Sequence, residues 1–333
     1  MTTTIQVFAE TFPIAGSFTI SRGSRTEIHV VVAEISQAGH TGRGECVPYT
    51  HYGESLASVR QQIEAMAPHL AQMGELRGAR DDLSGAMAPG AARNALDCAL
   101  FDLEAKQTGQ RVWDLLSMPP PPDLITAYTL SLGSPEDMGQ AARDMSGRAL
   151  LKLKLGGEGD VDLDRVRAVR QGAPKARLIV DANEAWTPEM VVPFSEILGG
   201  LGVELIEQPL PSGGDGMLAD MPHPVPICAD ESCHVSSDLA NLVGRYDVVN
   251  LKLDKSGGLT EGLVMVRDAR KLGFGIMVGC MLGTSLAMAP GTILGSLADF
   301  VDLDGPLLLA NDRPTPLVYR DSYVAAPTAG LWG

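Results

Sequence analysis

Charged residues stand at the carboxyl ends of several short apolar runs, where a buried strand would carry only apolar side chains. Three of them are acidic and end three successive runs: Asp181, Glu207 and Asp230. Carboxylates brought close together repel one another unless a cation lies between them. Because three carboxylates without His or Cys form a hard oxygen site, the pattern predicts bound Mg²⁺, or Mn²⁺ in its place, rather than zinc.

Two lysines flank this acidic set along the chain, Lys154 before it and Lys252 after it. In a closed ring of strands the two amines would approach the centre from opposite sides. A cation between two amines suits proton transfer at a carbon next to a carboxylate, because the cation neutralises the charge that develops as the proton leaves. Burial beside Lys152 and the cation would lower the pKa of the amine that acts as the base.

A simpler interpretation gives each of these side chains a structural role, in which an acid caps a helix or a lysine pairs with an acid. That interpretation is adequate for one residue, but for acids at the ends of three successive runs it requires a coincidence. We therefore expect the charged residues to form one catalytic site.

Eight short runs rich in leucine and β-branched residues, each followed by a helical stretch, must position these side chains. Their starts are 22 to 27 residues apart, which is the length of one strand, one helix and two loops. The spacing predicts an α/β fold with a (β/α)8-type barrel, whose active site forms where the strands end. An open doubly wound sheet would alternate in the same way, but no GxGxxG motif follows a first strand. The runs are 124–130, 149–155, 176–183, 203–209, 225–232, 247–253, 274–281 and 300–306.

The part of the chain before these runs has a different pattern. Residues 5–48 alternate apolar and polar positions, which predicts an antiparallel meander, and 55–73 and 90–116 have apolar residues at helical spacing. The proline run 119–122 favours an extended spacer and marks a boundary. We expect an α+β capping domain over 1–117, a catalytic barrel over 118–310, and a C-terminal segment over 311–333 that packs back on the cap.

Composition narrows the classes of partner. The 333 residues carry a formal net charge of −15, which would repel a phosphate backbone, so we expect no nucleic-acid partner. No apolar run approaches the roughly 20 residues that a bilayer span needs, and the N-terminus lacks a signal-like segment, so we expect a cytoplasmic protein without a membrane partner. The five cysteines form no CxxC pair and are expected to be buried free thiols.

Five motifs occur in order along the second part of the chain: LKLK at 151–154, VDANE at 180–184, EQP at 207–209, ADES at 229–232 and NLKLDKSGGLTE at 250–261. They resemble the muconate-lactonizing-type branch of the enolase superfamily, and within it the dipeptide epimerases that act on L-Ala-D/L-Glu. The resemblance covers nearly the whole chain, and it implies a Mg²⁺-dependent isomerase. Such an enzyme epimerises a dipeptide at the α-carbon of its C-terminal residue, by 1,1-proton transfer through an enediolate.

The resemblance also implies roles for the charged residues. It makes Asp181, Glu207 and Asp230 the Mg²⁺ ligands, and it makes Lys154 and Lys252 the two opposed acid/base residues. A Lys or His base beside Mg²⁺ is the general pattern of this superfamily.

Further roles concern the first lysine and the substrate. Lys152 would tune Lys154, and Asp302 and Asp304 would bind the free ammonium group of the dipeptide. The two acids alternate onto one face of the last run, which agrees with that role. Arg25 would meet the distal carboxylate of the substrate, with Arg22 as the alternative.

Other functions remain open from the sequence. A lyase or cycloisomerase of the same superfamily needs no ammonium site, so Asp302 and Asp304 favour the epimerase. An N-acylamino-acid racemase becomes the better interpretation if the substrate has no free ammonium group. A barrel that binds ligands without catalysis would not need both lysines at its rim, and a Ser-His-Asp hydrolase is disfavoured because the chain has no GxSxG motif.

Overall fold

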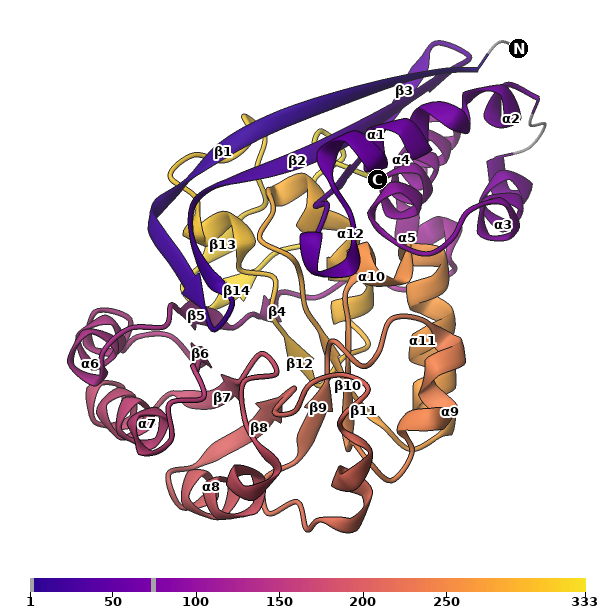
Figure 1. Ribbon diagram of the computed structural model, residues 1–333. Coiled ribbons are helices and arrows are strands. Elements are labelled where there is room, and N and C mark those ends of the chain that lie inside the picture. Colours follow the sequence, from indigo (N-terminus) through magenta and orange to yellow (C-terminus); the bar gives the residue numbers. More distant parts are fainter. Residues whose placement is uncertain (1–2, 73–75) are drawn as a thin grey trace.

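The structure is a computed structural model that describes residues 3–72 and 76–333 (Figure 1). Residues 1 and 2, where the expected cap begins, and residue 73, where the first expected helical stretch ends, lie outside the described part. No helix in the described ranges is both long and apolar enough to cross a bilayer.

The cap contains a three-stranded antiparallel sheet, as the alternating pattern predicted. Its strands are β1 (Thr4–Ile20), β2 (Gly23–Gln37) and β3 (His40–Cys46), and β2 lies between the other two. Helix α4 (Ala91–Thr108) packs so closely on this sheet that a Cβ atom at Gly44 would lie 2.0 Å from a backbone oxygen of the helix. Only glycine permits that approach. The other cap helices are α1 (Leu56–Ala65), α2 (Ala67–Ala71), α3 (Leu76–Ala86) and α5 (Val112–Leu115).

Eight parallel strands form one curled sheet beneath the cap, in the order in which they occur along the chain. The backbone N–H of Ala127, just before the first of them, donates to Val301 O in the last at 2.8 Å and so links the two ends of the sheet. The strands are β5 (Tyr128–Leu130), β6 (Leu150–Lys154), β7 (Arg177–Asp181), β8 (Val203–Glu207), β9 (Ile227–Ala229), β10 (Val248–Leu251), β11 (Gly275–Val278) and β12 (Phe300–Val301).

The expectation for the first run, 124–130, is wrong in one detail. Its beginning, β4 (Leu124–Ile125), leaves the barrel and pairs antiparallel with β14 (Tyr323–Val324), while β13 (Tyr319–Arg320) completes this small sheet. Only residues from Tyr128 onward join the barrel, because the C-terminal segment gives the preceding residues a partner of their own.

The expectation that a helical stretch follows every strand is also only partly met. Within the described residues, the connection after β8 has only the short 3₁₀ turn η2 (Gly216–Asp220), and β12 is followed by η4 (Gly305–Leu308). Residues 209–216 contain two prolines and three glycines, which disfavour an α-helix. The barrel helices are α6 (Pro135–Asp144), α7 (Asp160–Gly172), α8 (Pro188–Gly200), α9 (Leu239–Leu242), α10 (Leu253–Ser256), α11 (Leu259–Lys271) and α12 (Ser285–Gly295).

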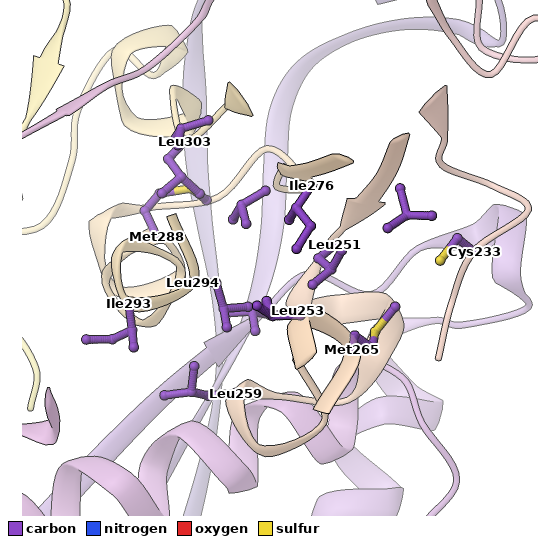
Figure 2. Close-up of a cluster of buried hydrophobic side chains, with 14 of the residues drawn as sticks. Cys233, Leu251, Leu253, Leu259, Met265, Ile276, Met288, Ile293, Leu294 and Leu303 are labelled. Carbon is purple, nitrogen blue, oxygen red and sulfur yellow. The ribbon is translucent and has the colours of Figure 1, made fainter. Parts of the chain in front are cut away.

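The apolar core lies mainly between the strands and these helices. Figure 2 shows one part of it, in which Leu251 of β10 and Ile276 of β11 lie together with Met265 of α11 and Leu294 of α12. All five cysteines are free thiols as expected, and four are buried, whereas Cys280 is half-buried at the mouth of the barrel.

The C-terminal residues pack against the cap. Trp332 is fully buried, and its indole Nε1 donates to Cys98 O in α4 at 3.0 Å. The Gly333 N–H donates to Asp102 Oδ1 at 2.8 Å, and the Val112 N–H donates to Gly333 O at 3.0 Å. These contacts join α4 and α5 to the end of the chain.

Replacing Trp332 by Ala should therefore lower the free energy of unfolding by about 3–5 kcal/mol, because it leaves a large cavity between the cap and the C-terminal segment. Urea unfolding followed by circular dichroism measures the loss. Phe8→Ala is the matched control, since Phe8 is 42% exposed and its loss should cost about 1 kcal/mol or less. Equal losses in the two variants would contradict the packing described here.

Candidate active site

The inner face of the barrel changes from apolar to charged along the strands. Side chains two residues apart on a strand share a face, so the charged layer lies directly above the apolar one. The apolar layer is Leu150, Ile179, Leu205, Cys228, Val248 and Met277. The charged layer, two residues further along each chain segment, is Lys152, Asp181, Glu207 and Asp230, and the uncharged Asn250 lies at the same level after Val248.

The two lysines expected to oppose one another both reach acids in this layer. Lys154 ends β6, and its Nζ lies 2.5 Å from Asp181 Oδ2. Lys252 follows β10, and its Nζ lies 2.6 Å from Asp230 Oδ2. Because β6 and β10 are four places apart in a ring of eight strands, the lysines enter the mouth from opposite sides.

Lys152 occupies the centre of the acidic group. Its Nζ lies 2.6 Å from Glu207 Oε2, 2.8 Å from Asp302 Oδ2 and 3.3 Å from Asp181 Oδ2. All four side chains are buried. The sequence-predicted acids and lysines are therefore brought into one site, and Lys152 contacts acids from three different strands or strand ends.

These acids favour the charged forms of Lys152 and Lys252. Burial alone would lower the pKa of Lys152, but the carboxylates of Asp302 and Glu207 outweigh it and hold the pKa well above its usual range. Burial also lowers the pKa of Lys252, but the carboxylates of Asp230 and Glu207 raise it by more, so this pKa too lies well above its usual range. This direction is opposite to the lowered pKa expected for a base beside a cation, because the amines here are surrounded by carboxylates.

The three acids expected to bind Mg²⁺ differ in how well they are compensated. Burial would raise the pKa of Asp181, but Lys154 and Lys152 bring it down to about 2. Lys252 and Lys255 similarly overcome burial and hold the pKa of Asp230 well below its usual range. Glu207 is the exception, since burial and then the charge of Asp181 raise its pKa to about 7.

The chemistry of this donor set fits a hard divalent cation. The three acids supply oxygen ligands from neighbouring chain segments, and Asp181 and Glu207 are paired in register across β7 and β8. Among residues 3–72 and 76–333, no donor meets the buried Glu207 Oε2 in hydrogen-bonding geometry, although Lys152 Nζ is close. Within the described ranges no three such groups converge closely enough to share one ion as they stand. A cation bound by all three would therefore have to replace the ammonium groups now paired with them.

Asp302 and Asp304 line the same cavity from the segment just beyond β12. Both are buried, and Asp304 Oδ2 accepts from the Thr129 N–H at 2.6 Å. Burial and the neighbouring Asp302 charge raise the pKa of Asp304 to about 7. In the part of the chain that the structure describes, Asp302 Oδ1 is buried without a hydrogen-bond donor, so this pair can accept a further cationic group.

The two candidate arginines differ in their partners. Arg22 donates to Glu231 Oε1 at 2.8 Å, Asn183 O at 3.0 Å and Tyr49 OH at 3.1 Å, so protein acceptors already hold its guanidinium. Arg25 lines the same cavity and lies 5.6 Å from the centre of the Tyr49 ring. Throughout residues 3–72 and 76–333, Arg25 forms no ion pair, which leaves its charge open to a ligand.

The cavity has about 840 Å³ of space, part of it open to solvent, and it lies between the cap and the barrel mouth. Its apolar wall includes Phe18, Ile28, Met281 and Leu282. The predicted acids and lysines that line it are Lys152, Lys154, Asp230, Lys252, Asp302 and Asp304.

Sequence reasoning assigned no site role to several residues that belong here. Lys255 Nζ lies 2.6 Å from Asp230 Oδ1, and Asn250 Nδ2 donates to Glu207 Oε1 at 2.8 Å. Both residues stand within the motif at 250–261, so their position was the available signal. Tyr52, which lines the cavity from the cap, carried no such signal.

Comparison with known proteins gives the family. Residues 2–117 match the mandelate racemase / muconate lactonizing enzyme N-terminal domain, and residues 137–331 match the enolase C-terminal domain-like family. The chain is 47% identical to the L-Ala-D/L-Glu epimerase of Escherichia coli (strain K12), over 93% of this chain and 95% of that protein. It is 43% identical to the N-acetyl-D-glutamate racemase of Pseudoalteromonas sp, over 91% and 95%.

Solved structures agree with this relationship. An enolase family member from Agrobacterium tumefaciens with homology to dipeptide epimerases, containing sodium and L-Ala-L-Glu, is 52% identical with a TM-score of 0.95, covering 99% of this chain and 100% of that one. Three dipeptide epimerase structures that are 27–28% identical to this chain are complexed with Mg and a dipeptide. The fold, the arrangement of charged residues and both family matches lead to one conclusion: the chain belongs to the mandelate racemase / muconate lactonizing enzyme branch of the enolase superfamily.

Proposed function

We propose that this chain is a Mg²⁺-dependent dipeptide epimerase that inverts the α-carbon of the C-terminal residue of L-Ala-D/L-Glu or a similar L-Ala-X dipeptide. The observation that carries the proposal is the combination of two opposed lysines, Lys154 and Lys252, with the buried pair Asp302 and Asp304 in one cavity. Opposed amines suit inversion at carbon, and paired acids suit a substrate with a free ammonium group.

The lysines exchange the α-proton. One amine, in its neutral form, takes the proton on its side of the α-carbon, so that the C–H bond breaks and an N–H bond forms. The other lysine, in its ammonium form, delivers a proton to the opposite side, so that the configuration inverts. The reverse reaction uses the same two groups with their protonation states exchanged.

The three acids Asp181, Glu207 and Asp230 would hold the Mg²⁺ ion. When bound there, the ion supplies positive charge that stabilises the substrate carboxylate as the α-carbon loses its proton. Asp230 would then pair less strongly with the Lys252 ammonium group that it now contacts. Lys252 would then be better able to act as a base, because Asp230 and Glu207, which raise its pKa, would be neutralised.

The remaining charged groups orient the dipeptide. Asp302 and Asp304 would accept hydrogen bonds from its ammonium group, with the open Asp302 Oδ1 as one acceptor. Arg25, whose charge is open to a ligand, would meet the distal carboxylate of a C-terminal Glu. Arg22 is the weaker candidate for this role, because protein acceptors hold its guanidinium.

A second candidate is racemisation of an N-acylamino acid, and the N-acetyl-D-glutamate racemase that is 43% identical to the chain favours it. The two functions share the lysines and the metal, and they differ in whether a free ammonium group is present. A lyase or cycloisomerase would likewise have no use for the buried acid pair. The first substrate screen should therefore compare free and N-acetylated dipeptides for deuterium incorporation in D₂O with Mg²⁺.

Removal of the metal should lower the rate of epimerisation by more than about two orders of magnitude and leave the fold intact, because the acids lie above an apolar barrel core. Circular dichroism and a dipeptide assay after EDTA treatment measure both. Adding Mg²⁺ back is the control. The proposal fails if protein verified as metal-free epimerises the dipeptide at a comparable rate.

Loss of either lysine should separate exchange from inversion. Lys154→Ala and Lys252→Ala should each lower net epimerisation by roughly 10²–10⁴-fold, while one diastereomer of the dipeptide still exchanges its α-proton through the surviving amine. NMR in D₂O follows both reactions, and Lys175→Ala, at an exposed position, is the control. If both site variants epimerise at near wild-type rates, the base has to be sought at Lys152 or Lys255.

Asp304→Asn tests the ammonium site, since it removes a charge and keeps the shape. The kcat/KM for a free dipeptide should fall about tenfold to a hundredfold, the loss of one charge-assisted hydrogen bond of roughly 1.5–3 kcal/mol. N-acetylated dipeptides should be poor substrates of the wild type and lose little more in the variant. Asp164→Asn, on the exposed face of α7, should leave both unchanged. A wild-type preference for N-acylated substrates would favour the racemase instead.

A further inference from the structure

We propose that Glu184 is a positioning residue that anchors two separate segments of the cap over the cavity and thereby sets the affinity for substrate without touching it. The inference rests on the proposed function only for the identity of that substrate. Glu184 follows directly on Asn183, which lines the cavity, but Glu184 itself does not.

The carboxylate of Glu184 is the shared partner of both cap segments. Its Oε2 lies 2.9 Å from His51 Nε2 and 3.3 Å from Arg22 Nη1. Its Oε1 accepts from the Ser212 N–H at 2.7 Å, which ties the side chain to the barrel. Arg22 belongs to the first cap segment, residues 20–25, which contains the turn between β1 and β2 and reaches down to the barrel in Figure 1. His51 belongs to the second cap segment, residues 49–53, which contains η1 (Thr50–Tyr52).

These two cap segments form part of the cavity wall. Gly23 and Arg25 line the cavity from the first segment, and Tyr49 and Tyr52 line it from the second. Arg22 also donates to Tyr49 OH at 3.1 Å, so the segments are linked to each other as well as to Glu184. A change at Glu184 therefore shifts the residues that meet the substrate, although the barrel floor with its acids and lysines stays in place.

The backbone holds Glu184 in an unusual conformation. Asn183 and Glu184 have φ values of 44° and 67°, in the left-handed region that non-glycine residues seldom adopt. The Glu184 N–H donates to Gln208 O at 2.8 Å, and the Asn183 N–H donates to Asp181 Oδ1 at 2.9 Å. This bend turns one residue into the cavity wall and the next into the contact with the cap. Strain of this kind persists where the surrounding structure fixes it, and it is concentrated at functional sites.

The ion pairs of Glu184 with Arg22 and His51 are partly shielded from solvent. The Glu184 side chain is 12% exposed, compared with 26% for Arg22 and 35% for His51. A partly buried carboxylate with several partners is screened less by solvent than an exposed pair. By contrast, the Arg177–Glu204 pair at the other end of β7 has both side chains about 40% exposed, and it provides a matched control.

The test is Glu184→Gln, which keeps the size of the side chain and an acceptor for Ser212 but removes the charge. The KM for L-Ala-L-Glu should rise about tenfold while kcat stays within about twofold, because the substitution weakens only the attachment of the two cap segments to the barrel. Hydrogen exchange without substrate should become faster at residues 20–25 and 49–53 and stay unchanged at 150–154. Glu204→Gln should alter neither quantity.

A double-mutant cycle with His51→Gln sharpens the test, since both residues act through one contact and their effects on KM should be less than additive. Unchanged KM and exchange in Glu184→Gln, strictly additive effects, or a fall in kcat at constant KM would each overturn the inference. Faster exchange throughout the chain would also overturn it, since it would indicate general destabilisation. If the wild type turns over no dipeptide, the proposed function fails, whereas the exchange comparison still decides the role of Glu184.

Discussion

Mutual neutralisation of buried charges at the barrel mouth is the constraint on which the rest of the structure depends. Burying a charge is costly unless partners of opposite sign surround it, so these groups must be positioned together. The buried acids are Asp181, Glu207, Asp230, Glu231, Asp302 and Asp304, and the buried lysines are Lys152, Lys154, Lys252 and Lys255. The strands supply that positioning, because β6, β7 and β8 carry Lys152, Asp181 and Glu207 two residues beyond apolar residues of the barrel floor, and Asp230 and Asp302 follow directly on the ends of β9 and β12.

The same constraint explains how the site can change state. In the described arrangement, acids hold Lys152 and Lys252 in their charged form, while Glu207 remains poorly compensated. A divalent cation on the acids would relieve both conditions, since it would compensate Glu207 and free the amines from their partners. The proposed chemistry thus requires redistribution of charge within the mouth and movement of the acid side chains toward one another, since within the described residues they do not yet converge on one point.

The cap completes the site from the other side. It contributes the arginines, aromatic residues and much of the apolar wall, and its own position depends on contacts at Glu184 and along α4. Under the proposed function, barrel residues carry the charges near the reacting carbon, and cap residues enclose the rest of the dipeptide. Differences in substrate among related enzymes can therefore arise in the cap while the barrel is kept.

Much of this architecture could be predicted from the sequence, because strand side chains alternate strictly and barrel sites form where strands end. That argument placed Asp181, Glu207 and Lys252 at one mouth without a structure. It could not choose between Arg22 and Arg25, nor find Glu184, because those roles depend on where cap loops meet the barrel.

The local sequence pattern also failed to predict one detail of the fold, the division of residues 124–130 between two sheets. Residues 124 and 125 leave the barrel because they pair with β14, a strand about 200 residues further along the chain, which the pattern of neighbouring residues cannot reveal. The domain borders at 117/118 and 310/311 stay predictions.

A crystal structure of the wild type with Mg²⁺ and L-Ala-L-Glu tests the central claim most directly. The account predicts the ion on Asp181, Glu207 and Asp230, with the α-carbon of the C-terminal residue between Lys154 Nζ and Lys252 Nζ. An ion bound elsewhere, or both amines on the same side of that carbon, would contradict it.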